Sequence, residues 1–462
     1  MFRIILIFLF VIFVNMSEGV FAFDIVYPKK DNVTINADKT FFIGNEQICK
    51  SLKINGQPVI LHQSGGFKHT VHLDYGVNSF VIDNGADKKV YKIVRPAKSA
   101  KIAKERKFIH YGSEKIIKTS SQNVPLRSSP VDAGLNRLQH LQKDIELVAI
   151  GEYGDFYKVR LGRDDTAWIS KSNTQISDSK EFVLGVIKST SSYEDDDFRY
   201  YKFTVDKKVP YVLSESGLNG YNLVLYNMSD ELYNFGKYEF NISQKGKNFG
   251  YSAYYNDENE LIVKIRKYKS SLKGLKIVID PGHGGSERGA IGCLCDAEKD
   301  VNLAIALKLR NKLQKLGAEV LLTRADDKYL GLQERVNFTN ENNAQMFVSI
   351  HNNALADSQA DKEAKGTEVY YFYSQSRYLA KVISKMLSSE VGFKNRGAKG
   401  GSFAVIRNSE CPAVLIEVGF MIDPDENSKL INSDFQEKIA DGIIKGIEKY
   451  FKEVDMEIIL GK

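Results

Sequence analysis

Two hydrophobic rhythms divide the 462-residue chain. Up to about residue 269, short runs such as "TVHLDY" and "NSFVID" alternate apolar and polar residues between Gly-, Asn- and Asp-rich turns, which predicts β-strands. From about residue 272, the apolar runs "LKIVID", "AEVLLTR", "QMFVSI", "TEVYYFY" and "PAVLIE" are separated by helix-period segments such as "EKDVNLAIALKLRNKLQKLG" and "FQEKIADGIIKGIEKYF". The chain is therefore predicted to be multi-domain, with small all-β domains before a C-terminal α/β domain whose mostly parallel sheet is flanked by helices.

Changes in this rhythm and in composition suggest the domain boundaries. The length allows three or four domains. The charged stretch "AKSAKIAKERK" has no aromatic residues, which indicates a solvated linker. The predicted segments are a signal peptide at 1–22, a small all-β domain at 23–96, the linker at 97–107, a compact β-barrel at 108–175, a β-rich domain of unreadable role at 181–269 and the α/β domain at 272–456.

The first 22 residues differ from the rest of the chain. Arg3 precedes the apolar run "IILIFLFVIFV", and a small-residue pattern ends at Ala22, as at the cleavage site of a secretory signal peptide. The run is much shorter than the roughly 20 residues of a membrane-spanning helix. We therefore expect export to the periplasm, the cell wall or the exterior, with no integral membrane segment after cleavage. An uncleaved anchor is the alternative.

Composition and charge limit the classes of partner. Hydrophobic residues make up 43% of the chain and charged residues 26%, as in folded globular proteins. The net charge of +6 is spread without a long basic block, so no nucleic acid is expected. The four cysteines are too few for a disulfide framework. Buried thiols, or one disulfide involving Cys411, are favoured over a metal site at Cys293 and Cys295, and Cys49 has no obvious partner.

Three polar residues follow predicted strands of the α/β domain. His283 stands in "IVIDPGHGG", His351 in "SIHNNA" and Glu417 in "PAVLIEVGF". Because ligands of parallel sheets bind beyond the carboxyl ends of the strands, we expect these side chains at one edge. A catalytic zinc commonly takes two histidines and one carboxylate and keeps a fourth position for water. Alone, each histidine is as readily a solvated side chain, and the glutamate a salt-bridge partner.

The residues alone do not decide which carboxylate is the third metal ligand. The candidates are Asp280, Glu287, Asp296 and Glu298. Asp280 precedes a proline and more readily shapes the turn, while Glu287 and Asp296 stand in loops. Glu298 opens a predicted helix, which can aim its carboxylate at the sheet edge. A glutamate in the first turn of a helix is, however, also favoured by the helix dipole.

Five motifs in order resemble the zinc-dependent N-acetylmuramoyl-L-alanine amidases of bacterial cell walls: "IVIDPGHGG", "EKDVNLAIALKL", "VLLTRADD", "SIHNNA" and "PAVLIEVGF". The resemblance covers roughly residues 272–454. It implies that His283, Glu298 and His351 bind Zn²⁺ and that Glu417 is catalytic. The implied reaction is hydrolysis, by a zinc-activated water, of the amide between the lactyl group of N-acetylmuramic acid and the L-alanine of the peptidoglycan stem peptide.

A second resemblance concerns the predicted β-barrel at 108–175. "VPLRSSP" and "TAWISKS" are similar to the opening and closing patterns of bacterial SH3-like modules, which often hold cell-wall peptides. Ala167 replaces the usual glycine, and Trp168 suits a core position as well as a contact surface.

Two other functions remain as alternatives to the amidase. One is a zinc peptidase that acts within the stem peptide. The other is a non-catalytic scaffold that binds the cell wall, which three β segments before the α/β domain would suit. The complete set of His, Glu, His and Glu argues against the scaffold. An activator protein is a further possible partner that the sequence does not identify.

Overall fold

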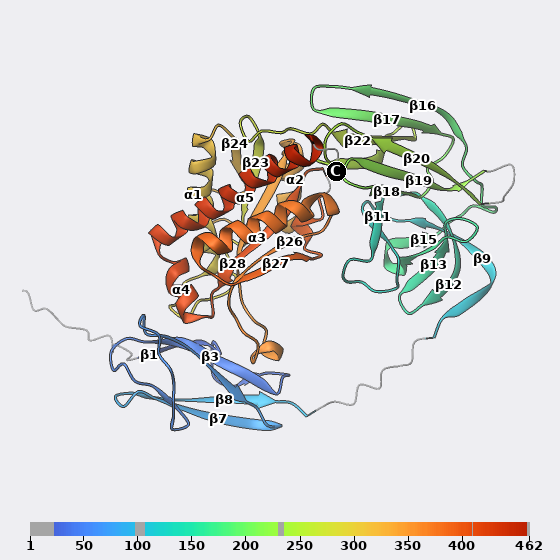
Figure 1. Ribbon diagram of the computed structural model, residues 1–462. Helices are drawn as coiled ribbons and strands as arrows, with labels where there is room; N and C mark the ends of the chain where they lie inside the picture. The colour runs from blue at the N-terminus through green and yellow to red at the C-terminus, as the bar shows by residue number, and fades with distance from the viewer. Residues whose placement is uncertain (1–22, 98–106, 230–234, 409, 460–462) are drawn as a thin grey trace, which may run out of the picture. The chain divides into compact units, whose positions relative to one another are not determined.

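The computed structural model describes residues 23–97, 107–229, 235–408 and 410–459, with the backbone alone at 453–459 (Figure 1). The predicted signal peptide and most of the predicted linker lie outside these residues. Two compact units make up the described chain. The first contains residues 23–97 together with the short segments 293–295 and 356–361, and the second contains the remaining described residues.

The first unit is rich in β-structure, as predicted. Its two sheets have the strand orders β1-β3-β6 and β2-β8-β7-β4-β5. Phe42, Phe67 and Ile82 are fully buried in its core. The elements are β1 (Phe23–Tyr27), β2 (Val33–Thr34), β3 (Lys39–Glu46), β4 (Lys53–Ile54), β5 (Gln57–Pro58), β6 (Gly66–His72), β7 (Gly76–Asp83), β8 (Lys88–Arg95) and the 3₁₀ helix η2 (Asp357–Gln359).

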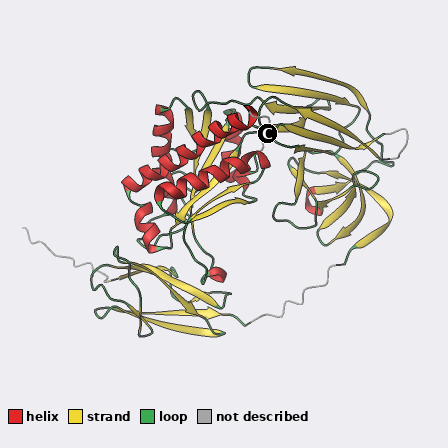
Figure 2. Cartoon of the chain, in the orientation of Figure 1, coloured by secondary structure: helices red, strands yellow, loops and turns green. Residues whose placement is uncertain are grey.

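The second unit begins with three antiparallel sheets (Figure 2). The first sheet has the strand order β11-β10-β14-β13-β12-β9-β15. Its strands are β9 (Ile109–Thr119), β10 (Val124–Arg127), β11 (Arg137–Leu141), β12 (Glu146–Tyr153), β13 (Phe156–Arg160), β14 (Thr166–Ser170) and β15 (Thr174–Ile176), and the 3₁₀ helix η1 (Lys171–Asn173) precedes β15. The others, β16-β17-β22-β21 and β18-β19-β20, use β16 (Ile187–Glu194), β17 (Phe198–Val205), β18 (Tyr211–Glu215), β19 (Gly220–Met228), β20 (Gly236–Ser243), β21 (Tyr251–Tyr255) and β22 (Glu260–Arg266).

One hydrophobic cluster runs through all three of these sheets. It extends from Ile117 on β9 to Ile265 on β22 and includes Tyr211 and Leu223 of the β18-β19-β20 sheet. The segments predicted at 108–175 and 181–269 therefore share a core instead of enclosing two separate ones.

The final part of the second unit is a six-stranded sheet with the order β24-β23-β25-β28-β26-β27. Neighbouring strands are parallel except β26 and β28, which are antiparallel. The predicted mostly parallel sheet with helices is confirmed. Its strands are β23 (Lys276–Pro281), β24 (Glu319–Leu322), β25 (Met346–Asn353), β26 (Thr367–Tyr371), β27 (Asn395–Gly400) and β28 (Ala413–Phe420). Strand β27, "NRGAKG", was not expected because it lacks alternating apolar residues.

Helices cover the two faces of this sheet unequally. On one face, Ile277, Val348 and Ile416 belong to the core beneath α1, α3 and α5, which Figure 1 draws side by side over the sheet. On the other face, Val278 and Leu415 pack with residues of α2 and η4. The helices are α1 (Glu298–Lys315), α2 (Leu332–Glu341), η3 (Ser374–Ser376), α3 (Arg377–Val391), η4 (Ala404–Ile406), α4 (Pro424–Leu430) and α5 (Ser433–Ile459).

Helix α1 matters most for the site because Glu298 is its first residue. Val301, Ile305, Leu309 and Leu313 recur every four residues and are buried, so they form the apolar stripe that holds a helix against a sheet. Packing of this stripe fixes the direction in which the first turn points. Among the described residues, no helix combines the length and apolar character needed to cross a membrane.

Candidate metal centre and active site

Three neighbouring parallel strands bring the predicted residues together. β23 pairs with β25, and β25 with β28, in a register that sets Asp280 beside Ser349 and His351 beside Glu417. Since side chains alternate along a strand, these four lie on the face of Val278, Phe347 and Leu415. The polar positions therefore share one face near the carboxyl ends of the strands.

His283, Glu298 and His351 form what we call the His–Glu–His cluster. His283 Nε2 lies 3.1 Å from Glu298 Oε2, and His351 Nδ1 lies 2.9 Å from Glu298 Oε1. One possible ligand atom from each residue lies within 4.8 Å of the other two. Both oxygens of one carboxylate thus face an imidazole nitrogen, and the three side chains can hold one metal ion.

Glu298 is 4% exposed and is held by further donors. Its carboxylate accepts hydrogen bonds from the backbone N–H groups of Ala290 (2.8 Å) and Asn352 (3.1 Å) and from the side chain of Asn302 (3.3 Å). Burial alone would raise the pKa of Glu298, but hydrogen bonds from the two histidines hold the pKa far below its usual range. The carboxylate is therefore a fixed anion between two imidazoles.

The loop that carries His283 has an unusual backbone. His283 adopts a φ of 62°, in the left-handed region that few residues other than glycine occupy. Gly282 lies so close to the His351 ring that a Cβ there would stand 2.1 Å from the ring. The first glycine of "GHGG" is thus required for the two histidines to approach each other.

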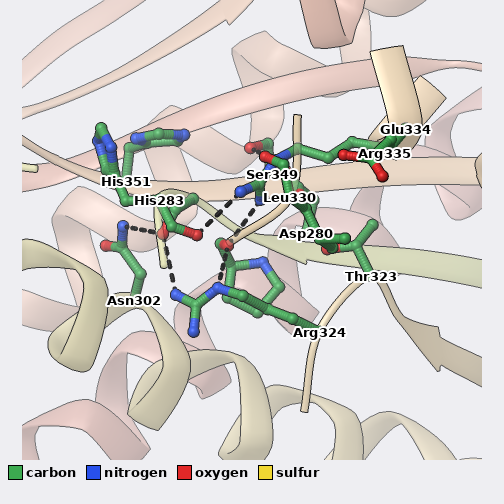
Figure 3. Close-up of polar contacts among 12 residues, drawn as sticks. Asp280, His283, Asn302, Thr323, Arg324, Leu330, Glu334, Arg335, Ser349 and His351 are labelled. Atoms are coloured by element: carbon green, nitrogen blue, oxygen red, sulfur yellow. Dashed lines mark hydrogen bonds and ion pairs between the residues drawn. The ribbon is translucent and has the colours of Figure 1, made fainter. Parts of the chain in front are cut away.

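Two arginines hold this loop through its carbonyl oxygens. Arg324 donates to the carbonyls of Pro281 and Gly282, both at 2.9 Å. Arg335, on α2, donates to the carbonyl of His283 at 2.8 Å. Figure 3 shows both guanidinium groups directed at this part of the chain. The strained backbone is therefore held by bonds from residues distant in the sequence.

Asp280 has a structural place rather than one in the His–Glu–His cluster. It is fully buried, pairs with Arg335 at 2.7 Å, and accepts hydrogen bonds from Thr323 (2.6 Å) and Ser349 (2.8 Å) (Figure 3). The other two candidates are not members of the cluster, although Glu287 lies beside His283. Glu287 Oε1 is 3.8 Å from His283 Nδ1, and Asp296 accepts a hydrogen bond from Asn427.

Glu417 lies next to the cluster in a poorly solvated position. Its Oε2 atom is buried and has no hydrogen-bond partner, although part of the residue is exposed. Burial raises the pKa of Glu417 well above its usual value, and the negative charges of Glu298 and Glu368 raise it further. This carboxylate is therefore ready to accept a proton.

Glu368 was not identified from the sequence. It stands opposite Glu417 in the antiparallel pair of β26 and β28 and binds Arg396 (2.7 Å), Lys399 and the hydroxyl of Tyr370 (2.7 Å). Burial opposes its ionisation, but these bonds lower the pKa of Glu368 to about 2. Glu368 lies near Glu417 because β26 pairs with β28. No local sequence pattern predicts that pairing.

The cysteines contribute nothing to the His–Glu–His cluster. Cys411 is fully buried, and burial raises the pKa of its thiol to about 12, so it is a poor nucleophile. Cys293 is buried and Cys295 is exposed. No disulfide joins the four cysteines, all of which are described.

The fold and the site define an α/β enzyme domain with a candidate metal centre at the carboxyl ends of parallel strands. The family model described as N-acetylmuramoyl-L-alanine amidase matches residues 277–449. The protein YqiI of Bacillus subtilis, described as uncharacterized, is 39% identical over 186 residues, which are 39% of this chain and 87% of that protein. The chain belongs to the N-acetylmuramoyl-L-alanine amidase family, and its final domain is the catalytic domain of such an enzyme, as predicted.

Other relatives match a similar share of this chain. A probable cell wall amidase, LytH, of Staphylococcus epidermidis is 35% identical over 182 residues, 39% of this chain and 60% of that protein. The chain thus spans less than two thirds of this relative. The crystal structure of an N-acetylmuramoyl-L-alanine amidase from Clostridium difficile 630 is 37% identical and covers 39% of this chain and 98% of its own, with a TM-score of 0.37.

Proposed function

We propose that the catalytic domain is a Zn²⁺-dependent peptidoglycan amidase in which His283, Glu298 and His351 hold the metal and Glu417 transfers the proton. The bond cleaved is the amide between the lactyl group of N-acetylmuramic acid and the L-alanine of the stem peptide. The geometry of the His–Glu–His cluster carries this proposal.

The donor atoms of the cluster suit zinc. Two imidazole nitrogens and one carboxylate oxygen lie within 4.8 Å of one another, and catalytic zinc sites commonly have two histidines, one carboxylate and an open position. Bonds from Ala290 and Asn352 keep the Glu298 carboxylate in place, as outer partners of metal ligands do. When bound, Zn²⁺ polarises the scissile carbonyl and lowers the pKa of a water molecule.

Glu417 supplies the proton transfer in this proposal. Part of Glu417 remains exposed, so in this proposal its carboxylate can meet the attacking water. Glu417 takes one proton from that water and returns it to the nitrogen of the leaving L-alanine, which departs as a neutral amine. A carboxylate with a raised pKa performs such a transfer better near neutral pH than an ordinary one.

We further infer that the enzyme acts outside the cytoplasm and that the seven-stranded sheet of β9–β15 is an SH3-like module that binds the cell wall. The apolar N-terminal run supports export, and the relatives named cell wall amidases support the location. Trp168, next to Phe108 with ring centroids 5.8 Å apart, remains partly exposed and accessible to a wall peptide.

Metal analysis of the purified protein tests the ligand assignment. Wild type and His72→Ala, which changes an exposed histidine, are expected to retain stoichiometric zinc, whereas His283→Ala loses it. Full zinc retention by His283→Ala would reject the assignment.

Mass spectrometry of digested peptidoglycan tests the bond. Free stem peptides that begin with L-alanine are expected, and fragments cut within the stem would indicate a peptidase instead. A Glu417→Ala protein that binds walls with undiminished lysis would argue against the role of this residue and reopen the scaffold alternative.

A further inference from the structure

A cavity of about 570 Å³ lies in the second unit, apart from the His–Glu–His cluster. Residues of β11, β21, α2 and the segment around η4 line it. The three antiparallel sheets from β9 to β22, which we call the three-sheet region, and the catalytic domain therefore both contribute walls. None of the four proposed catalytic and metal-binding residues is part of the lining. The cavity is therefore separate from the candidate metal centre.

Two arginines give the cavity its charge. Arg137 Nε is buried without a hydrogen-bond partner, and its Nη1 lies 3.3 Å from His140 Nε2. Arg407 donates to the backbone oxygen of Ser402 at 3.0 Å. Within the part of the chain that the structure describes, neither arginine forms an ion pair with a carboxylate. Nearby Arg127, by contrast, pairs with Asp132.

The surroundings compensate this positive charge only in part, because Asp132, whose negative charge acts on Arg407, is paired with Arg127. Glu410 is the one acidic residue among the described residues of the lining, and its carboxylate faces Lys264 at 3.5 Å. Burial, followed by the charges of Arg137 and Arg407, lowers the pKa of His140 to about 4. An unpaired, partly buried guanidinium is costly to desolvate and favours a planar anion such as a carboxylate.

The rest of the lining suits a peptide. Amide side chains from β11, α2 and the loop before β10 line the cavity with the arginines, among them Gln139, Gln333, Asn337 and Asn123, and Tyr254 adds a ring. Each amide offers both a donor and an acceptor, which matches the alternating N–H and C=O groups of a peptide backbone. A polyol phosphate has no such alternation.

Both catalytic-domain walls of the cavity are connected to the active site. From α2, Arg335 reaches the backbone oxygen of His283 at 2.8 Å. Next to η4, Phe403 packs edge-on against Tyr370, with ring centroids 4.8 Å apart, and the Tyr370 hydroxyl donates to Glu368. A ligand in the cavity would therefore touch the elements that position the proposed ligands and base.

We propose that this cavity is a substrate subsite in which Arg137 and Arg407 bind a free carboxylate of the peptidoglycan stem peptide. The identity of the peptide rests on the proposed function, whereas the preference for a carboxylate rests on the two unpaired arginines. The three-sheet region thus contributes directly to substrate recognition by the catalytic domain.

Calorimetric titration of the full-length protein tests this subsite. The probe is a synthetic stem peptide that begins with L-alanine and has free carboxylates, compared with the same peptide after amidation of its carboxylates. Arg137→Gln and Arg407→Gln are each expected to weaken binding of the free acid about tenfold or more, since a charge-assisted hydrogen bond contributes that much. Amidation should weaken binding to wild type by a similar factor.

Arg199→Gln is the matched control, because Arg199 lies on β17 and pairs with Glu194 at 3.2 Å. It should bind the peptide as wild type does, and circular dichroism confirms that all three variants fold. Equal affinity for the acid and the amide, or unchanged binding by both cavity variants, would overturn the proposal. Binding of an oligomeric glycerol phosphate at the arginines, with no binding of the peptide, would overturn the peptide assignment.

Parallel digestion of purified peptidoglycan separates this inference from the proposed function. Normal release of stem peptides by a protein that does not bind the free peptide would reject the subsite alone. Carboxylate-dependent peptide binding by a protein that never cleaves the lactyl–L-alanine amide would reject the proposed reaction and leave the subsite standing.

Discussion

The two faces of the catalytic sheet are made by the same strands but have different chemistry. Beneath α1, α3 and α5 the strands present mostly apolar side chains, including fully buried Ile279 and Ile350. The opposite face starts apolar at Val278 and Phe347 and becomes polar toward the carboxyl ends of the strands. One face stabilises the fold, and the other holds the site.

The polar face is stable because its charges are paired. Asp280 and Arg335 are both almost fully buried and bind each other, and Asp280 also accepts two hydroxyl groups. Glu368 is likewise surrounded by donors. Glu417 is the exception, with a buried oxygen that lacks a partner. A buried polar atom without a partner costs stability, and here that atom lies beside the His–Glu–His cluster, which agrees with the role proposed for Glu417.

Removing the proton carrier should have the largest effect. Glu417→Gln keeps the size of the side chain but cannot accept the proton, so the rate of stem-peptide release is expected to fall about 10²–10⁴-fold. Zinc content should not change. Glu363→Gln, at an exposed residue paired with Lys394, is the control. A fully active Glu417→Gln enzyme would contradict the proposed role.

Breaking the buried ion pair should cost the most stability. Asp280→Ala leaves Arg335 buried without its partner, and the free energy of unfolding is expected to fall by about 3–5 kcal/mol, as measured by urea denaturation. Metal affinity should fall as well, because Arg335 also holds the His283 loop. Asp164→Ala, at an exposed site, should change stability by less than about 0.5 kcal/mol. Equal stability of the two variants would contradict this expectation.

A substitution that creates a cavity on the apolar face should affect stability alone. Leu309→Ala removes a fully buried side chain of α1 and is expected to lower the free energy of unfolding by about 2–5 kcal/mol. The zinc content and the rate per folded molecule should be retained, in contrast to Asp280→Ala, because the other three residues of the α1 stripe still hold the helix against the sheet. Leu316→Ala, at a side chain that is 43% exposed, is the matched control. Loss of zinc by folded Leu309→Ala would show that the two faces are not separable.

The smallest effect concerns the pH dependence. Glu417 acts in its ionised form, so activity is lost as the pH falls through its raised pKa. The negative charge of Glu368 contributes to that raised pKa. Glu368→Gln removes the charge and should therefore lower the pKa of Glu417 and move the acidic limb of the rate profile to lower pH. The Glu363→Gln profile should match wild type, and an unshifted or upward-shifted limb in Glu368→Gln would contradict the coupling.

The sequence alone was sufficient for most of the catalytic fold. Apolar runs predicted five of its six strands, and helix periods identified α1 and α5, since both patterns follow from which side of an element is buried. Strand β27 was not predicted because its sequence does not alternate apolar and polar residues. The shared core of the three-sheet region was also not predicted, because its contacts join residues far apart in the sequence. Gln142, for example, donates a hydrogen bond to the backbone oxygen of Tyr255, 113 positions away.

For the site, the sequence by itself predicted that His283, His351 and Glu417 meet at one edge of a parallel sheet. His283 follows β23 as expected, whereas His351 and Glu417 lie within β25 and β28. The motif resemblance already selected Glu298 over Asp280, Glu287 and Asp296. Only the tertiary structure showed that its carboxylate lies between the two histidines. It likewise decided that Glu368 faces Glu417 and that Arg137 and Arg407 share a cavity. The physical reason is that periodicity reports the burial of each element locally, whereas the meeting of two side chains depends on how distant elements pack.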